Sequence, residues 1–190
     1  MKVINLFGAP GSGKSTVAAG LFYLLKARGV ICELTQEYAK EMVWADSTGT
    51  PGKQPAGMED QISIFAEQNR RLVRVKDKIE VAVTDSPILL SSVYAPERYP
   101  ASFHALVADV FRSYSNVNFF LERAIPYENV GRLHDEKQAE ALGWRMRDLM
   151  DKSGVPYEVL PGDEAAPWEI MKRLGLGSMA PKRSFLESVA

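Results

Sequence analysis

The chain has one cysteine, little net charge and no long hydrophobic run, and each of these absences excludes a class of protein. A lone cysteine, Cys32, cannot form an intramolecular disulfide, and its place in an expected strand favours a buried thiol over a nucleophile. The apolar run from Val17 to Leu25 is interrupted and too short to cross a bilayer. Because Met1 and Lys2 lead directly into an expected strand, we expect no signal peptide, no membrane contact and a cytoplasmic location.

The charge and the length narrow the possibilities further. A net charge of −1 provides no broad attraction to nucleic acid or to a membrane surface, although a local basic patch remains open. At 190 residues and 46% hydrophobic content, the chain suits one α/β domain with a full core. We expect this domain over residues 1–175 and a tail without hydrophobic periodicity over 176–190. The oligomeric state stays open, with a homodimer among the options.

A glycine-rich turn lies between the first expected strand, Val3 to Phe7, and the first expected helix. Residues Gly8 to Ser15 read G-x-x-x-x-G-K-S, and this spacing in this context predicts a phosphate-binding loop rather than a turn that merely caps a helix. Glycines allow the backbone to wrap a polyphosphate and to point N–H groups at it, beside the positive end of the helix. We therefore expect ATP and Mg²⁺ to bind here. The expected nucleotide-binding residues are Gly8, Ala9, Pro10, Gly11, Ser12, Gly13, Lys14, Ser15 and Thr16.

The remaining elements alternate along the chain. Expected strands at 30–35, 81–83, 117–121 and 157–160 follow the first one, and expected helices cover 14–28, 37–45, 58–76, 101–114 and 136–152, with a short last helix around Trp168 to Leu174. Residues 46–57 are turn formers and predict a loop. Five strands alternating with helices predict a parallel sheet covered on both faces, an α/β fold.

Two acids follow expected strands, at the edge of the sheet where ligands bind in open parallel folds. Asp85, after the third strand, is placed to meet Mg²⁺ together with the Ser15 hydroxyl, and a helix-capping role for Asp85 is the structural alternative. Glu37, after the second strand, is the candidate that accepts the acceptor proton. Lys14 is expected to contact the β- and γ-phosphates.

The helix over 58–76 presents two stripes. We expect its buried stripe to consist of Met58, Ile62, Phe65, Leu72 and Val73. A different stripe holds Gln61, Gln68 and Arg71, for which substrate contact and ordinary surface are equally supported; Tyr38 is a further substrate candidate. Arg70 and Arg74 lie beside acids and favour ion pairing.

Arginines mark the segment beyond the fourth strand. Arg123 and Arg132 flank or lie within residues 124–135, a placement that suits a lid closing over phosphates and stabilising the transferred charge. His134 is a loop residue rather than a catalyst in this interpretation. The turn Pro161 to Asp163, after the fifth strand, is expected beside the nucleotide base.

The motifs favour a kinase among proteins with such a loop. A switch GTPase would carry an Asn-Lys-x-Asp motif for guanine recognition, which the sequence lacks. An AAA-type ATPase needs a further helical domain and oligomer arginines, for which the chain is short. A kinase uses the features present: Glu37 on the substrate side, Asp85 on the metal side, and a lid with Arg123 and Arg132.

Four stretches resemble the small P-loop kinases of tailed bacteriophages, over Met1 to about Gly162. They are Asn5 to Thr16, Glu37 to Glu41, Thr84 to Pro87, and Tyr127 with Gly131-Arg132. Among these kinases are the 5-hydroxymethyl-deoxyuridine DNA kinases, placed near the thymidylate kinases. The resemblance implies ATP-dependent phosphorylation of 5-hydroxymethyluracil in DNA, a step in viral thymine hypermodification, and a host-cytoplasmic location.

The sequence departs from thymidylate and nucleoside kinases at Ser86, since those families usually place an arginine after the acid. A duplex substrate would require base flipping and a basic grip on phosphates, for which Lys40, Lys53, Arg70, Arg71 and Arg74 are the candidates. Two alternatives use the same chain. One is a small-molecule kinase acting on a nucleoside, nucleotide or ribosyl-nicotinamide; the other is a nucleotide-gated binding module that contacts a protein through Tyr38, Trp44 and the loop 46–57.

Overall fold

The computed structural model describes residues 1–45, 60–124, 126–127 and 135–177. Several expectations fall outside these described residues: the loop over 46–57 with Lys53, the start of the third helix at Met58, most of the expected lid with Gly131, Arg132 and His134, and the tail from 178 onward.

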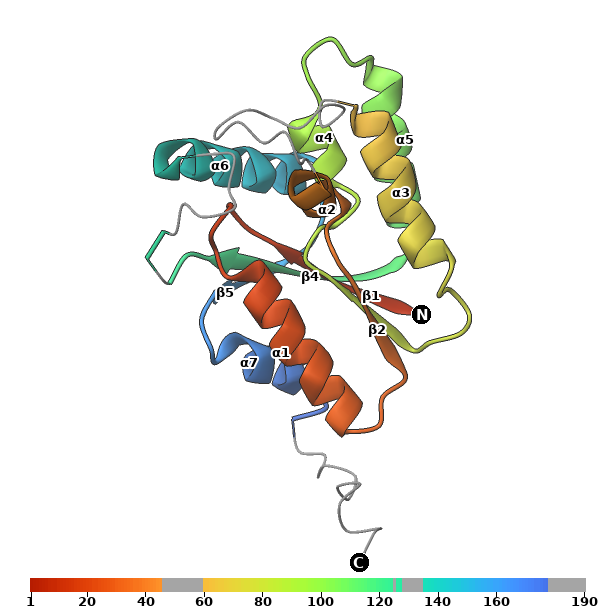
Figure 1. Cartoon of the computed structure of the whole chain (residues 1–190), viewed down its shortest axis with the longest axis vertical. Helices are drawn as coiled ribbons and strands as arrows, with labels where there is room; N and C mark the ends of the chain where they lie inside the picture. Colours follow the sequence, from red (N-terminus) through yellow and green to blue (C-terminus); the bar gives the residue numbers. More distant parts are fainter. Residues whose placement is uncertain (46–59, 125, 128–134, 178–190) are drawn as a thin grey trace, which may run out of the picture.

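The centre of the molecule is a five-stranded parallel sheet with the order β2-β3-β1-β4-β5 (Figure 1). The strands are β1 Lys2–Phe7, β2 Cys32–Thr35, β3 Val81–Thr84, β4 Ser115–Glu122 and β5 Glu158–Pro161. All four neighbouring pairs are parallel. The α/β class and the parallel sheet predicted from the sequence are therefore confirmed.

Helices cover both faces of the sheet (Figure 1). The described helices are α1 Lys14–Ala27, α2 Tyr38–Ala45, α3 Gln61–Val73, α4 Leu90–Tyr94, α5 Ala101–Arg112, α6 Glu136–Lys152 and α7 Ala166–Arg173. Residues of β1 alternate between two hydrophobic clusters: Ile4 and Leu6 pack with α1 and α7, whereas Val3 and Phe7 pack with α3 to α6. This period of two is what a central strand buried on both faces requires.

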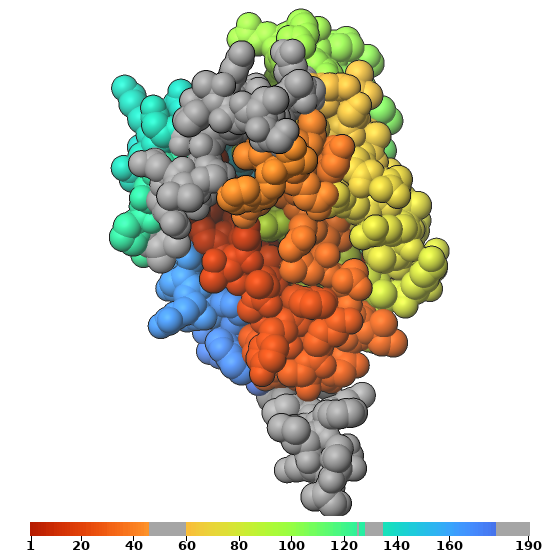
Figure 2. Space-filling view, viewed as in Figure 1, coloured from red at the N-terminus to blue at the C-terminus, as the bar shows by residue number. Residues whose placement is uncertain are grey.

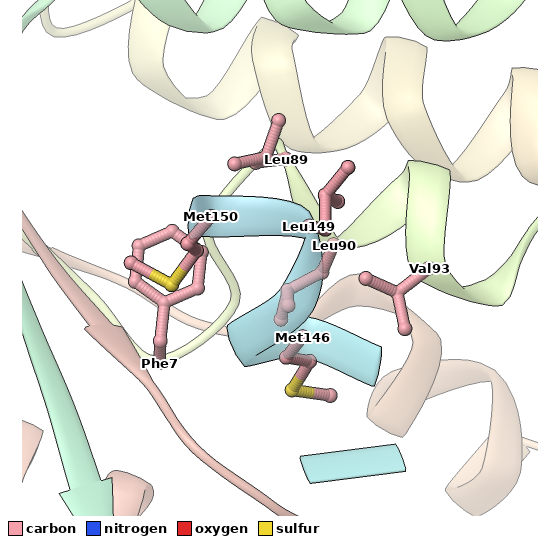
Figure 3. Close-up of a pocket in the computed structure, with 7 residues that line it drawn as sticks. All are labelled: Phe7, Leu89, Leu90, Val93, Met146, Leu149 and Met150. Carbon is pink, nitrogen blue, oxygen red and sulfur yellow. The ribbon is translucent and has the colours of Figure 1, made fainter. Parts of the chain in front are cut away.

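The short helix α4 was not expected, because its segment precedes a proline-rich bend and is too short to show a helical period. It packs against α6 above the end of β1 (Figure 3). The small hollow between them has no room for a water molecule, so it is core packing rather than a ligand site. Its lining residues are Phe7, Leu89, Leu90, Val93, Met146, Leu149 and Met150.

An asparagine network crosses the middle of the sheet. Asn5 in β1 is 1% exposed and donates to the side-chain oxygens of Asn116 and Asn118 in β4, at 2.9 Å each. Asn118 in turn donates to the Pro156 carbonyl at 2.9 Å, ahead of β5. Because buried amides are costly without partners, these bonds favour one register between β1 and β4.

The buried face of α3 differs from the predicted stripe. Ile62 and Val73, which we expected in the core, are 59% and 52% exposed, so that part of the prediction is wrong. Phe65 and Leu72 are buried as expected, together with Ile64 and two polar residues, Gln61 and Gln68. The prediction places only apolar residues on the buried face of α3, whereas this face also carries polar side chains that form hydrogen bonds inside the protein.

Other surface and core features follow the sequence more closely. Cys32 is buried in β2, and burial raises the pKa of its thiol, consistent with an unreactive core residue. The three tryptophans, Trp44, Trp144 and Trp168, are 68%, 72% and 49% exposed. Among the described helices, we find none whose length and apolar content would allow it to cross a membrane.

Candidate phosphoryl-transfer site

The glycine-rich turn connects β1 to α1, as predicted. Gly8, Gly11 and Gly13 have φ angles of 145°, 80° and 85°, a region that residues with a side chain rarely adopt. Gly13 is the N-cap of α1 and has no side chain with which to cap it. The first N–H groups of a helix lack partners within the helix, so this turn offers backbone donors to an anion.

The loop is packed from behind by other backbone segments. A Cβ atom at Gly8 would overlap the Ser12 hydroxyl and the Leu121 carbonyl, and one at Gly13 would overlap the Gly162 carbonyl. The Gly162 N–H donates to the Glu122 carbonyl at 2.7 Å, which fixes the turn after β5 to the end of β4. The turn that the sequence placed near the nucleotide base therefore packs directly against the phosphate loop, a contact that the spacing of glycines alone did not reveal.

Ser15 and Asp85 meet at the carboxyl edge of the sheet. The Ser15 hydroxyl donates to Asp85 Oδ2 at 2.6 Å, because β1 and β3 are neighbours and both end beside the first turn of α1. Asp85 is 6% exposed, and within the described part of the chain its second oxygen, Oδ1, is buried without a hydrogen-bond partner. A hydroxyl and a carboxylate are hard oxygen ligands of the kind that Mg²⁺ prefers.

This pair fits a magnesium ion that is shared with phosphates. In the described residues no group of three or more His, Cys, Asp or Glu side chains could form a self-contained metal site. Mg²⁺ commonly takes only one or two protein ligands and completes its coordination with phosphate oxygens and water. The buried, unpartnered Oδ1 of Asp85 and the adjoining anion cradle are consistent with that arrangement.

Lys14 extends over the loop itself. Its Nζ donates to the Gly8 and Ala9 carbonyls at 2.8 and 2.9 Å. The cation therefore lies beside the same turn whose N–H groups form the cradle, within reach of a bound polyphosphate. The residues predicted to bind the nucleotide, Gly8 to Thr16, lie in this turn and at the start of α1, and their role stays a prediction.

Glu37 lies at the same edge of the sheet, two residues beyond β2. The strands β2 and β3 are paired with Thr35 opposite Thr84, so Glu37 and Asp85 follow neighbouring strand ends. Burial raises the pKa of Tyr94 in α4, and the negative charge of Glu37 raises it further. Figure 2 shows the orange segment of α2 beside the red phosphate-loop segment, with yellow-green atoms visible in a hollow between them.

The substrate candidates on α3 are engaged within the protein. Gln68 is 3% exposed and hydrogen-bonds to the backbone of Gln36 and Tyr38. Arg71 forms ion pairs with Glu41 at 2.5 Å and Glu67 at 3.1 Å. Gln61, 5% exposed, is also inside, with its N–H donating to the Tyr99 hydroxyl at 3.0 Å.

Two of the five residues expected to form a basic patch, Arg70 and Arg71, are ion-paired. Arg70 pairs with Glu67 at 2.6 Å, as the sequence predicted, and Arg71 is held by two glutamates. Glu67 and Arg71 are four residues apart in one helix, so their ion pair can be predicted from the sequence. Glu41 lies in α2, so its ion pair with Arg71 cannot be predicted from spacing along the chain. The described arginines on this face therefore offer less positive charge to a DNA backbone than their number suggested.

Arg123 lies at the base of the expected lid but is paired with Glu136 at 2.7 Å, and its guanidinium lies 4.8 Å from the Tyr127 ring centroid. The sequence did not single out Arg147, which pairs with Glu122 at 2.9 Å and lies over the Phe120 ring. Both arginines connect the end of β4 to α6. Arg132, the other lid arginine, falls outside the described residues, so its role stays a prediction.

Comparisons with solved structures support the fold. The chain is similar to thymidylate kinase from Ehrlichia chaffeensis, with a TM-score of 0.61, 16% identity, and coverage of 91% of this chain and 98% of that one. It is also similar to deoxyadenosine kinase from M. mycoides, solved with bound dATP, with a TM-score of 0.58, 18% identity, and coverage of 92% and 100%. At these identities the likeness establishes the architecture alone. No curated protein matches the sequence.

A family model described as an AAA domain matches residues 3–166. The matched range contains the phosphate loop, Glu37 and Asp85, and it ends at the first residue of α7. We expect an AAA-type ATPase to need a further helical domain and oligomer arginines. The family match concerns only the single domain over residues 3–166. Because the match covers most of the chain, the protein belongs to this family of AAA domains.

Proposed function

We propose that the protein is a kinase that transfers the γ-phosphoryl group of ATP to a hydroxyl. The observation that carries the proposal is the Ser15–Asp85 hydrogen bond of 2.6 Å beside the glycine turn, with Glu37 at the neighbouring strand end. This arrangement brings a phosphate cradle, a pair of magnesium ligands and a carboxylate to one edge of the sheet. The kinase-like architecture supports the same interpretation.

Each site residue has a separate task in this mechanism. The loop N–H groups and Lys14 hold the phosphates of ATP, and Ser15 and Asp85 would hold Mg²⁺. Bound Mg²⁺ supplies neutralisation of the charge that develops on the phosphate oxygens. Glu37 accepts the proton of the acceptor hydroxyl, and Arg123 and Arg132 stabilise the transferred group. Arg123 does so once the nucleotide draws it away from Glu136.

The transfer is an in-line displacement. A bond forms between the acceptor oxygen and the γ-phosphorus, and the bond between that phosphorus and the oxygen bridging to the β-phosphate breaks. The electron pair of the broken bond leaves with ADP, and the hydroxyl proton passes to the Glu37 carboxylate. The products are ADP and a phosphate monoester.

For the acceptor we propose the 5-hydroxymethyl group of 5-hydroxymethyluracil within DNA. The support is the resemblance of Glu37 to Glu41 and of Thr84 to Pro87 to the phage DNA kinases, together with a serine rather than an arginine after Asp85. A base in a duplex would have to flip out to reach Glu37. Single-stranded DNA should therefore be the better substrate, because no base pair has to be broken.

A second candidate is a free nucleoside or nucleotide as acceptor. The observation in its favour is the pairing of Arg70 and Arg71 with glutamates, which leaves a weaker electrostatic grip for a DNA strand. The architectural likeness to thymidylate and deoxyadenosine kinases agrees with a small acceptor of this class.

The test is transfer of label from γ-labelled ATP to a panel of acceptors. The panel contains single-stranded and duplex DNA with 5-hydroxymethyluracil, the same DNA with thymine, free 5-hydroxymethyl-deoxyuridine, thymidine, thymidylate and deoxyadenosine, and a reaction without acceptor. Asp85→Asn serves as the inactive control, since it removes the buried carboxylate at nearly constant volume.

Label on DNA only when it contains 5-hydroxymethyluracil supports the first acceptor, and label on a free nucleoside or nucleotide supports the second. ATP hydrolysis at the same rate with and without every acceptor would instead indicate an ATPase. Binding of ATP with neither transfer nor hydrolysis would refute the kinase and favour the nucleotide-gated binding module.

A further inference from the structure

The segment that carries Glu37 is held by a side chain from α3. Gln68 Oε1 accepts a hydrogen bond from the Tyr38 N–H at 3.2 Å, and Gln68 Nε2 donates to the Gln36 carbonyl at 3.3 Å. These two groups belong to the peptide units on either side of Glu37. One buried amide, 3% exposed, thus fixes both backbone units that flank the proposed base.

Arg71 reinforces the same contact from one helical turn further along α3. Its Nη1 donates to the same Gln36 carbonyl at 3.1 Å, and its guanidinium lies 5.2 Å from the centre of the Tyr38 ring. The ion pairs with Glu41 and Glu67 hold the guanidinium in this position, and its side chain is only 11% exposed. An arginine bonded this way is a rigid support rather than a mobile cation.

The attachment of α2 depends on these polar contacts. Every residue of α2 is at least partly exposed, so the helix has little apolar burial with which to hold itself on the protein. Tyr38 begins α2, and the first N–H groups of a helix have no partner within it. Gln68 supplies the missing acceptor from α3, which sets where α2 starts and hence where Glu37 points.

We propose that Gln68, supported by Arg71, is a positioning residue that directs the Glu37 carboxylate at the acceptor hydroxyl. This inference rests on the proposed phosphoryl transfer with Glu37 as its base. Under this proposal, Gln68 and Arg71 hold the backbone on either side of Glu37. They do not recognise the substrate, a role for which the sequence pattern offers them as candidates. An error of about 1 Å in the placement of a catalytic group can lower a rate by about 100-fold.

The test is a double-mutant cycle on transfer kinetics with Gln68→Met, Glu37→Gln and the two combined. Methionine keeps the length of glutamine and removes its polar atoms. We expect Gln68→Met to lower kcat by about 10- to 100-fold with the KM values for ATP and acceptor unchanged. In the Glu37→Gln background the same change should have no further effect, because the carboxylate that Gln68 directs is gone. Arg71→Lys, which keeps the charge but not the fork, should show a smaller loss of the same kind.

The control is Ile62→Met, which introduces the same residue at a 59% exposed position of α3 and should leave kcat unchanged. A rise in acceptor KM with Gln68→Met in both backgrounds would overturn the proposal in favour of substrate contact. A lower melting temperature with unchanged kcat would also overturn it, since that is the result of a purely structural role.

A second readout does not depend on activity. Hydrogen exchange of the Tyr38 amide should be slow in the wild type and much faster in Gln68→Met, while exchange in the central strands stays the same. Fast exchange at Tyr38 in an active wild type would overturn the positioning role alone. If the wild type transfers phosphate to no acceptor, the proposed function fails and this role falls with it, whatever the exchange rate.

Discussion

At the residue scale, three side chains lie together at the phosphate loop. Lys14, Ser15 and Asp85 come from two segments 70 residues apart, and the Ser15–Asp85 bond joins them. Lys14 lies over the loop carbonyls, where it adds positive charge to a turn that already presents N–H donors. The site is therefore suited to bind an anion, and its interaction with phosphate groups should weaken sharply when the positive charge of Lys14 is removed.

Lys14→Ala tests that expectation. Loss of a preorganised positive group beside the transferring phosphate should reduce kcat by at least about 100-fold. Circular dichroism should show an unchanged fold, since the Lys14 side chain lies outside both hydrophobic clusters. Lys26→Ala, at the other end of α1, is the matched control and should retain full transfer. Unchanged turnover in Lys14→Ala would refute the site.

At the element scale, the junction between α2 and α3 is electrostatic. The hydrogen bond from Arg71 holds the pKa of Glu41 below its ordinary value of 4.5, although burial acts in the opposite direction. A carboxyl whose pKa is lower in the folded state stabilises the protein above its ordinary pKa. That contribution is lost as the pH falls through the folded-state pKa, below 4.5. The Glu41 side chain is 51% exposed, so the effect is screened by water and salt.

Glu41→Gln should accordingly destabilise the protein by less than about 1 kcal/mol at neutral pH. The difference from the wild type should shrink toward zero as the pH falls well below 4.5, because the wild-type carboxyl is then protonated as well. Thermal unfolding between acidic and neutral pH measures this, with Glu140→Gln on the exposed side of α6 as a control. A difference that stays constant with pH would argue against the ion pair.

The sequence predicted well whatever depends on neighbours along the chain. The phosphate loop, the order of strands and helices, and the bounds of α6 follow from local spacing and period. The roles of Gln68 and Arg71 could not be predicted in this way, because their partners are distant in the sequence. Both side chains donate to the Gln36 carbonyl, which is 32 residues from Gln68 and 35 from Arg71. Arg71 also pairs with Glu41, 30 residues away. A periodicity argument takes polar residues as surface, so it placed Ile62 and Val73 on the buried face of α3 and left Gln61 and Gln68 off it. Helix α4 was not predicted, because a helix of five residues is too short to show a helical period.

At the scale of the whole molecule, the phosphate loop is tied to both halves of the sheet. β1 lies between β3 and β4, and the loop after it is backed by Leu121 and Gly162 from the β4 and β5 side. Ser15 links the same region to Asp85 on the β3 side. A ligand that occupies the loop should therefore stabilise the entire fold and not only one helix.

Addition of ATP with Mg²⁺ should raise the melting temperature of the protein. At about 100 times the dissociation constant, binding contributes about 2.7 kcal/mol, which corresponds to a shift of roughly 5–10 °C for a chain of this size. ATP with a chelator should give a smaller shift, and Lys14→Ala a smaller one again. If Mg²⁺ and ATP left the wild-type transition unmoved, nucleotide binding at the loop would be ruled out.

The exposure of all three tryptophans decides how such transitions should be observed. Trp44, Trp144 and Trp168 lie on α2, α6 and α7, and none is in the core. An indole already in contact with water changes its emission little when the chain unfolds, so intrinsic fluorescence will follow global unfolding poorly. The same property makes Trp44 a native optical reporter for the short helix that begins beside Glu37, with the other two tryptophans replaced by phenylalanine.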